Sequence, residues 1–153
     1  MSFGLDMDTV ILKATSGEIG YEIDNEIMQD LLKIAGSQST WNKLPEYKGQ
    51  DVKTHEATLF NAINDASNTI LGNTKRYEAT FIICGKNAAT YIESLNTNIG
   101  QVREIFKRVS TNGIVGGPHL VGILDEKYKV YKNPYYPDNE ILVGAKGKQV
   151  SIA

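Results

Sequence analysis

One short stretch of this chain combines a thiol, a glycine and a cation. Cys84, Gly85 and Lys86 end a continuous apolar run, Ala79 to Cys84, which has the length and composition of a buried strand. In α/β folds, ligands bind beyond the carboxyl ends of such strands. The stretch lacks both the earlier glycine of a phosphate-binding loop and the Ser or Thr that follows its lysine. We therefore expect Cys84 to be a buried apolar side chain, with a small α/β enzyme or ligand-binding site at this turn as the alternative.

Carboxylates are concentrated near the start of the chain. Glu18 and Glu22 are four residues apart, as are Glu22 and Glu26, which would place each pair on one face of a helix. Such pairs can bind a metal or act as acid and base, but no histidine accompanies them at ligand spacing. We expect a solvated acidic face, and the alternative is contact with a basic patch on an adjacent subunit.

A basic stretch lies between Gln101 and Ser110. Its apolar residues fit the stripe of a helix, and Arg103, Lys107 and Arg108 lie within it. A solvated helix face is the simplest interpretation, and a phosphate- or partner-binding patch is the alternative. In the second case the patch would complement the acidic face of a neighbouring copy.

The most distinctive run occupies residues 128–137, which read YKVYKNPYYP. Its two prolines fix φ twice within four residues, so the run predicts a strand followed by a rigid aromatic loop. Tyr131, Tyr135 and Tyr136 are candidates for a subunit interface, where tyrosine is enriched. Stacking on nucleic-acid bases is a weaker alternative, because no basic groove surrounds the tyrosines.

Composition limits the function classes. The chain has 153 residues, which suits one domain, and its hydrophobic fraction of 41% is ordinary for a globular protein. A net charge of −2 gives no electrostatic argument for nucleic acid or an anionic membrane as the main partner. The single cysteine cannot form an intrachain disulfide, and we expect neither a signal peptide nor a transmembrane helix.

Periodicity and turn residues predict an α+β domain with a small central sheet and helices packed on it. A loop is expected over residues 37–53, and the acidic segment is either one long bent helix or two. The predicted helices are 9–15, 19–35, 54–71, 87–95 and 101–110, and the predicted strands are 79–84, 120–124, 127–132 and 141–145.

Three runs near the carboxyl end carry a resemblance to a known family: VGIL at 121–124, YKVYKNPY at 128–135 and NEILVGAKG at 139–147. Together they resemble the major capsid proteins of tailed bacteriophages, above all those of large contractile-tailed phages. Upstream, residues 76–85 look like the central strand of that family's axial domain. Residues 18–27 look like part of the spine helix of its peripheral domain.

The resemblance implies the tailed-phage major capsid protein fold. It assigns residues 1–50 to a spine-helix and peripheral-domain portion with a connecting loop, and residues 51–153 to an axial-domain-like core. It further implies a structural, non-enzymatic subunit of the virion capsid that is assembled in the host cytoplasm. Copies would associate as pentamers and hexamers, with Gly116 and Gly117 near the capsomer axis.

The expected partners are other copies of the chain, with no specific nucleic-acid sequence, membrane, small-molecule substrate, metal or cofactor. Members of the family are usually at least twice as long, so the resemblance also implies a core fragment or a compact form. Glu22, Glu26, Arg103, Lys107 and Arg108 would then set the register between neighbours.

Overall fold

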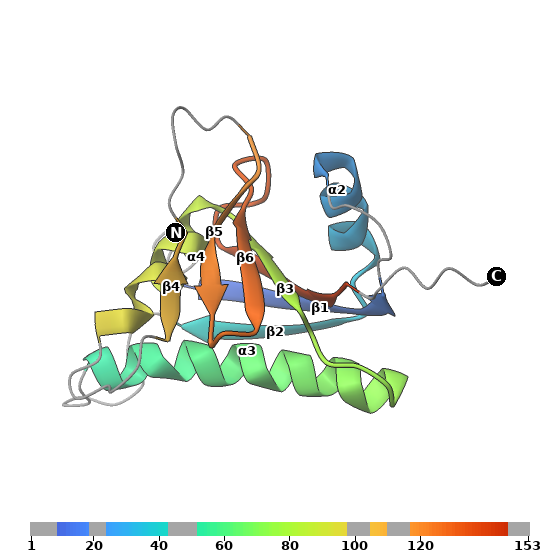
Figure 1. Cartoon of the computed structure of the whole chain (residues 1–153), viewed down its shortest axis with the longest axis horizontal. Coiled ribbons are helices and arrows are strands. Elements are labelled where there is room, and N and C mark those ends of the chain that lie inside the picture. The colour runs from blue at the N-terminus through green and yellow to red at the C-terminus, as the bar shows by residue number, and fades with distance from the viewer. Residues whose placement is uncertain (1–8, 19–23, 43–51, 98–104, 110–116, 147–153) are drawn as a thin grey trace, which may run out of the picture.

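A computed structural model of the chain describes residues 9–18, 24–42, 52–97, 105–109 and 117–146. Its described strands form one mixed, seven-stranded sheet in the order β2-β1-β7-β3-β6-β5-β4 (Figure 1). The strands are β1 (Thr9–Glu18), β2 (Ser37–Asn42), β3 (Phe81–Cys84), β4 (Phe106–Arg108), β5 (His119–Leu124), β6 (Tyr128–Lys132) and β7 (Glu140–Ala145). The helices are α2 (Asn25–Ile34), α3 (Val52–Thr74) and α4 (Lys86–Glu93), followed by the 3-10 helix η1 (Ser94–Thr97). The predicted α+β class is confirmed.

Strand β3 lies at the centre of the sheet, as its apolar composition predicts. It pairs in parallel with β6 and antiparallel with β7, and all four of its side chains are buried. Because side chains alternate along a strand, Phe81 and Ile83 pack beneath α2, whereas Ile82 and Cys84 belong to the cluster beneath α3 and α4. Burial on both faces explains why the strand has no polar side chain.

Helix α3 covers the opposite face of the sheet from α2 and runs along its whole width in Figure 1. The apolar stripe that predicts the helix is buried at Leu59, Ile63 and Ile70, each 0% exposed. Ser67 on the same face is also buried, and its hydroxyl accepts the Ala79 N–H at 3.0 Å. This bond ties the helix to the segment that leads into β3.

The ends of α3 differ from the prediction. The helix begins at Val52, two residues before the predicted start at Thr54. It continues past Gly72 to Thr74 and ends where Lys75 adopts a φ of 61°. A residue in the left-handed region commonly terminates a helix, and the Lys75 N–H still donates to a carbonyl one turn back.

Helix α2 is shorter than predicted in the part that the structure describes. Asp24 caps it, because its Oδ1 accepts the Ile27 N–H at 3.0 Å. Met28 and Leu31 are buried against the sheet. Ile34, the last residue of the helix, does not join this buried face, because its side chain is 67% exposed. Residues 19–23 lie outside the described part, so the predicted start of this helix is not described.

The helix predicted over residues 9–15 is wrong, because this segment is strand β1. Val10, Leu12 and Ala14 are buried on one face and intervening residues lie on the other, which is the two-residue period of a half-buried strand. β-Branched residues at the start of the segment favour the same conformation. Parallel pairing with β7 then fixes β1 within the sheet.

Two further predictions fail at strands on the sheet edges. Residues 37–42 lie in the predicted loop but form β2, which pairs antiparallel with β1 and buries only Trp41. Residues 106–108 lie in the predicted helix but form β4, where Phe106 is buried and pairs with Leu124. Residues 43–51 and 98–104 are outside the described residues. In both cases pairing with a distant strand decides the conformation, and the local periodicity of the sequence does not reveal that pairing.

Candidate subunit interface

The loop between β6 and β7, residues 133–139, is called the tyrosine loop below. Its first residue, Asn133, is completely buried, and its side-chain amide donates to Asn25 Oδ1 of the α2 terminus at 3.0 Å. The Asn133 side-chain oxygen accepts the Tyr135 N–H at 2.9 Å. The backbone N–H of Asn133 donates to the Cys84 carbonyl at 2.8 Å. One buried residue therefore joins the loop to helix α2 through its side chain and to the end of β3 through its backbone.

Tyr136 is used inside the subunit. It is 3% exposed, and its hydroxyl donates to the backbone carbonyl of Met28 in α2. Burial, with smaller contributions from Glu140 and Cys84, raises the pKa of the Tyr136 phenol above its ordinary range. The neutral hydroxyl thus holds α2 onto the tyrosine loop.

The other predicted interface tyrosines differ in exposure. Tyr135 is 65% exposed and points away from the core, whereas Tyr131 is half-buried and packs against the cluster beneath α2. Tyr128, at the start of the run, is fully buried, and its hydroxyl donates to Asn64 Oδ1 at 2.7 Å. Tyr135 is therefore the tyrosine of this run that offers most surface to a partner.

The turn that follows β3 is closed by the tyrosine loop. Gly85 is the N-cap of α4, and the N–H groups of Asn87 and Ala88 both donate to the Asp138 carbonyl at 3.0 Å. A Cβ placed on Gly85 would lie 2.0 Å from the carbonyl oxygen of Pro137. The donors that a phosphate would need at this helix terminus are thus already bound to backbone oxygens.

Cys84 has the surroundings of a structural cysteine. It is 0% exposed, its Sγ lies 3.3 Å from the Tyr131 carbonyl, and burial raises the pKa of its thiol, so the thiolate is disfavoured. Lys86 Nζ lies 3.7 Å from Asp138 Oδ2 at an exposed position, which is a weak ion pair. The structure gives no support to the alternative of a ligand site at Cys84-Gly85-Lys86.

The acidic helix face predicted near the start of the chain is only partly found. Glu26 and Asp30 are exposed on α2 and Asp24 is exposed at its start, whereas Glu22 lies outside the described residues. The predicted helical position of Glu18 is wrong, because Glu18 is the last residue of strand β1. No group of three or more Cys, His, Asp or Glu in the described ranges is arranged to hold a metal ion. Within those ranges, no helix has both the length and the apolar character to cross a membrane.

The basic residues do not share a helix face. Lys107 and Arg108 are neighbours on strand β4 and therefore point to opposite faces of the sheet. Arg108 Nη1 pairs with Glu93 Oε1 of α4 at 2.7 Å, so it already has an internal partner. Lys107 is exposed, and its cross-strand partner is Ile123. Arg103 lies outside the described residues.

The glycine-rich turn before β5 is described only at its end. Gly117 has a φ of 73°, a conformation that favours glycine, and Gly116 lies outside the described residues. The Gly117 carbonyl lies 3.0 Å from His119 Nδ1. This contact gives His119 a local structural role.

Comparison with protein families decides the identity of the chain. It matches the family described as Major capsid protein Gp23 over residues 1–151. The chain belongs to this family. The predicted resemblance to major capsid proteins of contractile-tailed phages is confirmed, and the protein is a structural subunit of a bacteriophage capsid. Comparisons with curated proteins and with solved structures gave no match.

Gp23 major capsid proteins are a structural family, which agrees with the arrangement around Cys84 and Lys86. Sequence reasoning missed two features of this subunit. The structural role of Asn133 was not predicted, although an asparagine that starts a turn often bonds to the backbone two residues ahead. Strand β2 was missed because most of its residues are polar and exposed.

Proposed function

We propose that this capsid subunit assembles with copies of itself into pentamers and hexamers of a phage shell, in the cytoplasm of the host. The family match over residues 1–151 carries the proposal. Its partners are other capsid subunits, and no enzymatic step is part of its role. The strength of the shell then comes from many modest contacts acting together.

Strands β3 to β7 with α3 and α4 correspond, in this proposal, to the axial domain of tailed-phage capsid proteins. Residues 1–50 supply the peripheral portion and its connection, and residues 51–153 supply the axial core. The mixed sheet with helices on both faces supports the proposal. Strand β1 of the first part pairs with β7 of the second, so the two parts share one sheet.

The contacts between neighbours are proposed to involve the acidic side of α2 and the basic segment around β4. Glu26 and Lys107 are exposed members of these two groups, and Tyr135 adds an exposed aromatic side chain. The same proposal includes Glu22, Arg103 and Arg108, and also Gly116, Gly117 and Tyr131. Tyr136 contributes to it only indirectly, because its buried hydroxyl holds α2 onto the tyrosine loop. Opposite charges on the two surfaces would orient neighbours as they associate.

Light scattering across a series of protein and salt concentrations tests self-association, with negative-stain microscopy of the same samples. We expect rings, sheets or shells whose yield falls as salt screens the charged contacts. A strict monomer at every concentration would contradict the proposed function. The double reversal Glu26→Lys with Lys107→Glu should restore an assembly that either single reversal weakens, and Lys75→Glu, at an exposed position away from both groups, is the matched control.

A further inference from the structure

The two edges of the sheet are built differently. Strand β4 forms one edge with only three residues, two of which are the exposed cations Lys107 and Arg108. Strand β2 forms the other edge over six residues, Ser37–Asn42, without a charge, a proline or a register shift against β1. Proteins usually protect exposed edge strands with these devices. Among the described strands, β2 is therefore the one suited to pair with an added strand.

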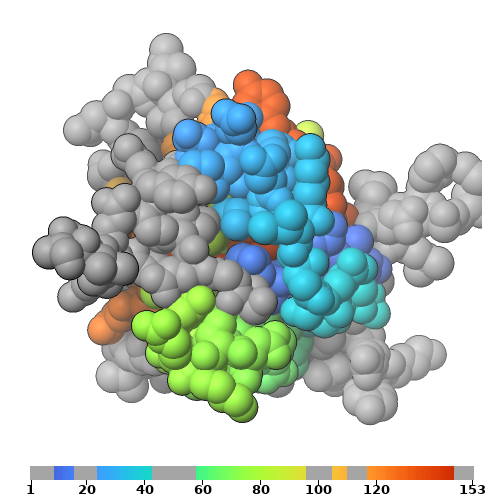
Figure 2. Space-filling model, turned by 90° about the vertical axis from the view of Figure 1, so that its right-hand side faces the viewer, coloured from blue at the N-terminus to red at the C-terminus, as the bar shows by residue number. Residues whose placement is uncertain are grey.

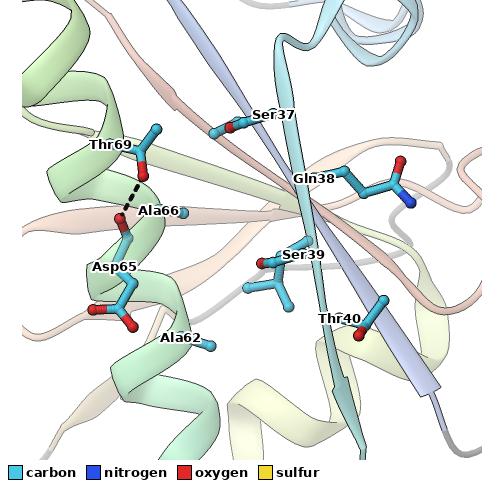
Figure 3. Close-up of a pocket in the computed structure, with 10 residues that line it drawn as sticks. Ser37, Gln38, Ser39, Thr40, Ala62, Asp65, Ala66 and Thr69 are labelled. Carbon is cyan, nitrogen blue, oxygen red and sulfur yellow. Dashed lines mark hydrogen bonds between the residues drawn. The ribbon is translucent and has the colours of Figure 1, made fainter.

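A hollow lies beside β2, between this strand and helix α3. Figure 3 shows Ser37 and Ser39 facing the helix across the gap, while Gln38 and Thr40 point away from it. The hollow has a volume of about 280 Å³ and continues towards a smaller one of about 140 Å³. Apart from Leu12, the residues that line the larger hollow are small or polar: Ala14, Ser37, Gln38, Ser39, Thr40, Ala62, Asp65, Ala66 and Thr69.

The hollow exists because small side chains meet there from both elements. Ala14, Ser37 and Ser39 of the sheet lie across from Ala62 and Ala66 of α3, so neither layer fills the space between them. A strand added to β2 would send every second side chain into this space. Its chemistry calls for branched apolar side chains and, because Asp65 is exposed at the rim, for one cation.

The carboxyl-terminal segment of the chain has this pattern. Residues 148–152 read KQVSI, so Lys148, Val150 and Ile152 share one face of an extended strand. The segment lies outside the described residues. We infer that residues 148–152 of a second copy of this chain pair with the outer edge of β2 and place Val150 and Ile152 in the hollow. This inference rests on the proposed self-association and names one contact within it.

Spacing favours a second copy over the same chain. Strand β7, which precedes the segment, is separated from β2 by β1, so the outer side of β2 lies three strand spacings, or about 14 Å, from β7. Val150 comes four residues after Lys146 and can reach about 14 Å only in a fully extended chain. Within one chain, the residues between Lys146 and Val150 would all be used to span this distance, and none would be left to form the turn that pairing requires. The segment of a neighbouring copy does not have to span this distance.

Antiparallel pairing gives a consistent register. Asp65 and Asn73 are eight residues apart on α3, or about 12 Å, and Lys148 and Ile152 are about 13 Å apart on an extended strand. Lys148 placed near Asp65 therefore brings Ile152 to the smaller hollow, which is lined by Ala14, Gly36, Ser37, Thr69, Ile70 and Asn73. The contact joins two different surfaces of the subunit, and repeated contacts of this kind form rings when the rotation between neighbours closes and open filaments when it does not.

Figure 2 looks onto the face where α2, β2 and the carboxyl end of α3 lie together. The position of β2 at this face agrees with a contact made from outside the subunit. The acidic helix α2 lies beside it on the same face, so the two proposed contacts are neighbours on the surface.

Amide hydrogen exchange of residues 37–40 in the full chain tests the inference, measured at low and at high protein concentration. We expect exchange at β2 to slow by at least about tenfold as concentration rises. The double variant Val150→Asp/Ile152→Asp should abolish this slowing. The matched control Gln149→Asp/Ser151→Asp changes the opposite face of the same segment and should retain it.

Each other outcome overturns the inference. Slowing that survives Val150→Asp/Ile152→Asp would assign another occupant to β2, and exchange independent of concentration but sensitive to that variant would mean pairing within one chain. Particles that form in microscopy without protection of β2 would refute this contact and leave the proposed function intact. A chain that never self-associates would refute both, and light scattering on the same samples separates these cases.

Discussion

The tyrosine loop and the β2 edge differ in whether a conspicuous sequence marks an exposed surface. The tyrosine loop has the most conspicuous sequence in the chain, yet Asn133 and Tyr136 are buried and join the loop to α2 and to the end of β3, while the Asp138 carbonyl accepts the first N–H groups of α4. Strand β2 has an inconspicuous polar sequence, yet it forms an open edge beside a hollow. Aromatic and proline-rich segments are thus not interfaces by composition alone, because the same rigidity serves an internal junction.

The difference has a physical origin in the way backbone groups are satisfied. The tyrosine loop supplies carbonyls to the first N–H groups of α4 and a side chain to the start of α2, so its polar groups find partners within the subunit. An edge strand has backbone groups on its outer side that no strand of the same subunit pairs with. Disrupting the tyrosine loop should therefore lower the stability of the subunit, and disrupting β2 should lower its association.

The largest effect is expected from Gly85→Ala in the turn closed by the tyrosine loop. The added Cβ would meet backbone oxygens of Pro137 and Asp138 at 2.0 Å and 2.8 Å, and backbone cannot move aside as a side chain can. We expect a loss of about 3 kcal/mol in the free energy of unfolding, measured by urea denaturation. Gly72→Ala is the control, since nothing lies within 4 Å of its added Cβ. Equal stability of the two variants would contradict the junction role of the loop.

A smaller loss is expected from Asn133→Ala. This change removes the bonds from a fully buried side chain to Asn25 and to the Tyr135 N–H. Loss of a buried polar partner should lower the free energy of unfolding by about 2 kcal/mol in urea denaturation. Asn68→Ala, at an exposed position of α3, should change it by less than about 0.5 kcal/mol. If Asn133→Ala unfolds like the parent chain, the tyrosine loop does not depend on its buried asparagine.

Tyr136→Phe should lower the free energy of unfolding by about 1 kcal/mol at neutral pH, because it removes the hydroxyl bond to Met28. Burial raises the pKa of Tyr136 in the folded state, so the folded state holds the phenol proton more tightly than the unfolded state does. The contribution of Tyr136 is therefore fully present below its ordinary pKa of about 10 and is lost as pH rises above that value.

Urea denaturation between neutral pH and the alkaline range checks this prediction. The parent chain should lose stability above about pH 10 more steeply than Tyr136→Phe does. Tyr135→Phe removes an exposed hydroxyl and should follow the parent curve. If the free energy of unfolding falls equally with pH in the parent chain and in Tyr136→Phe, burial does not raise the pKa of this phenol.

The smallest effect on stability is expected at the β2 edge, from Gln38→Lys/Thr40→Lys. Both side chains are exposed and point away from α3 in Figure 3, so the free energy of unfolding should change by less than about 0.5 kcal/mol. Charges on an edge strand oppose pairing with another strand, so association in light scattering should fall strongly. The same charges on α3, Asn61→Lys/Asn68→Lys, should leave association unchanged. If the β2 variant associates like the parent chain, β2 is not a surface for association, and the proposed difference between β2 and the tyrosine loop is wrong.

Where the local apolar pattern and the long-range strand pairing favoured the same element, the sequence was sufficient to predict it. The apolar run before Gly85 predicts the buried central strand β3, and the stripe of Leu59, Ile63 and Ile70 predicts α3, because both patterns record burial directly. The runs at 121–124, 128–135 and 139–147 indicated the capsid family, which the match over residues 1–151 confirms. These segments form the hairpin β5–β6 and strand β7 at the predicted places.

Where pairing with distant strands determined the conformation of a segment, the sequence was insufficient to predict it. β1 was predicted as a helix, since a short segment rich in apolar residues fits both periods, and only its neighbours β2 and β7 select the strand. The candidate interface residues were predicted by charge and by aromatic content, and exposure separated them: Tyr135 and Lys107 are exposed, Tyr136 is buried and Arg108 is paired internally.

By itself, the sequence determined the class of the fold, its central strand and its long helix, because composition and apolar spacing along the chain encode burial locally. The capsid family came instead from the resemblance of three runs near the carboxyl end. The tertiary structure alone decided which strands form the two edges of the sheet and which predicted interface side chains remain exposed. Those properties depend on pairs of segments that lie far apart in the chain, such as β1 with β7 and Asn133 with α2. Their free energy comes from contacts that exist only once both segments are in place.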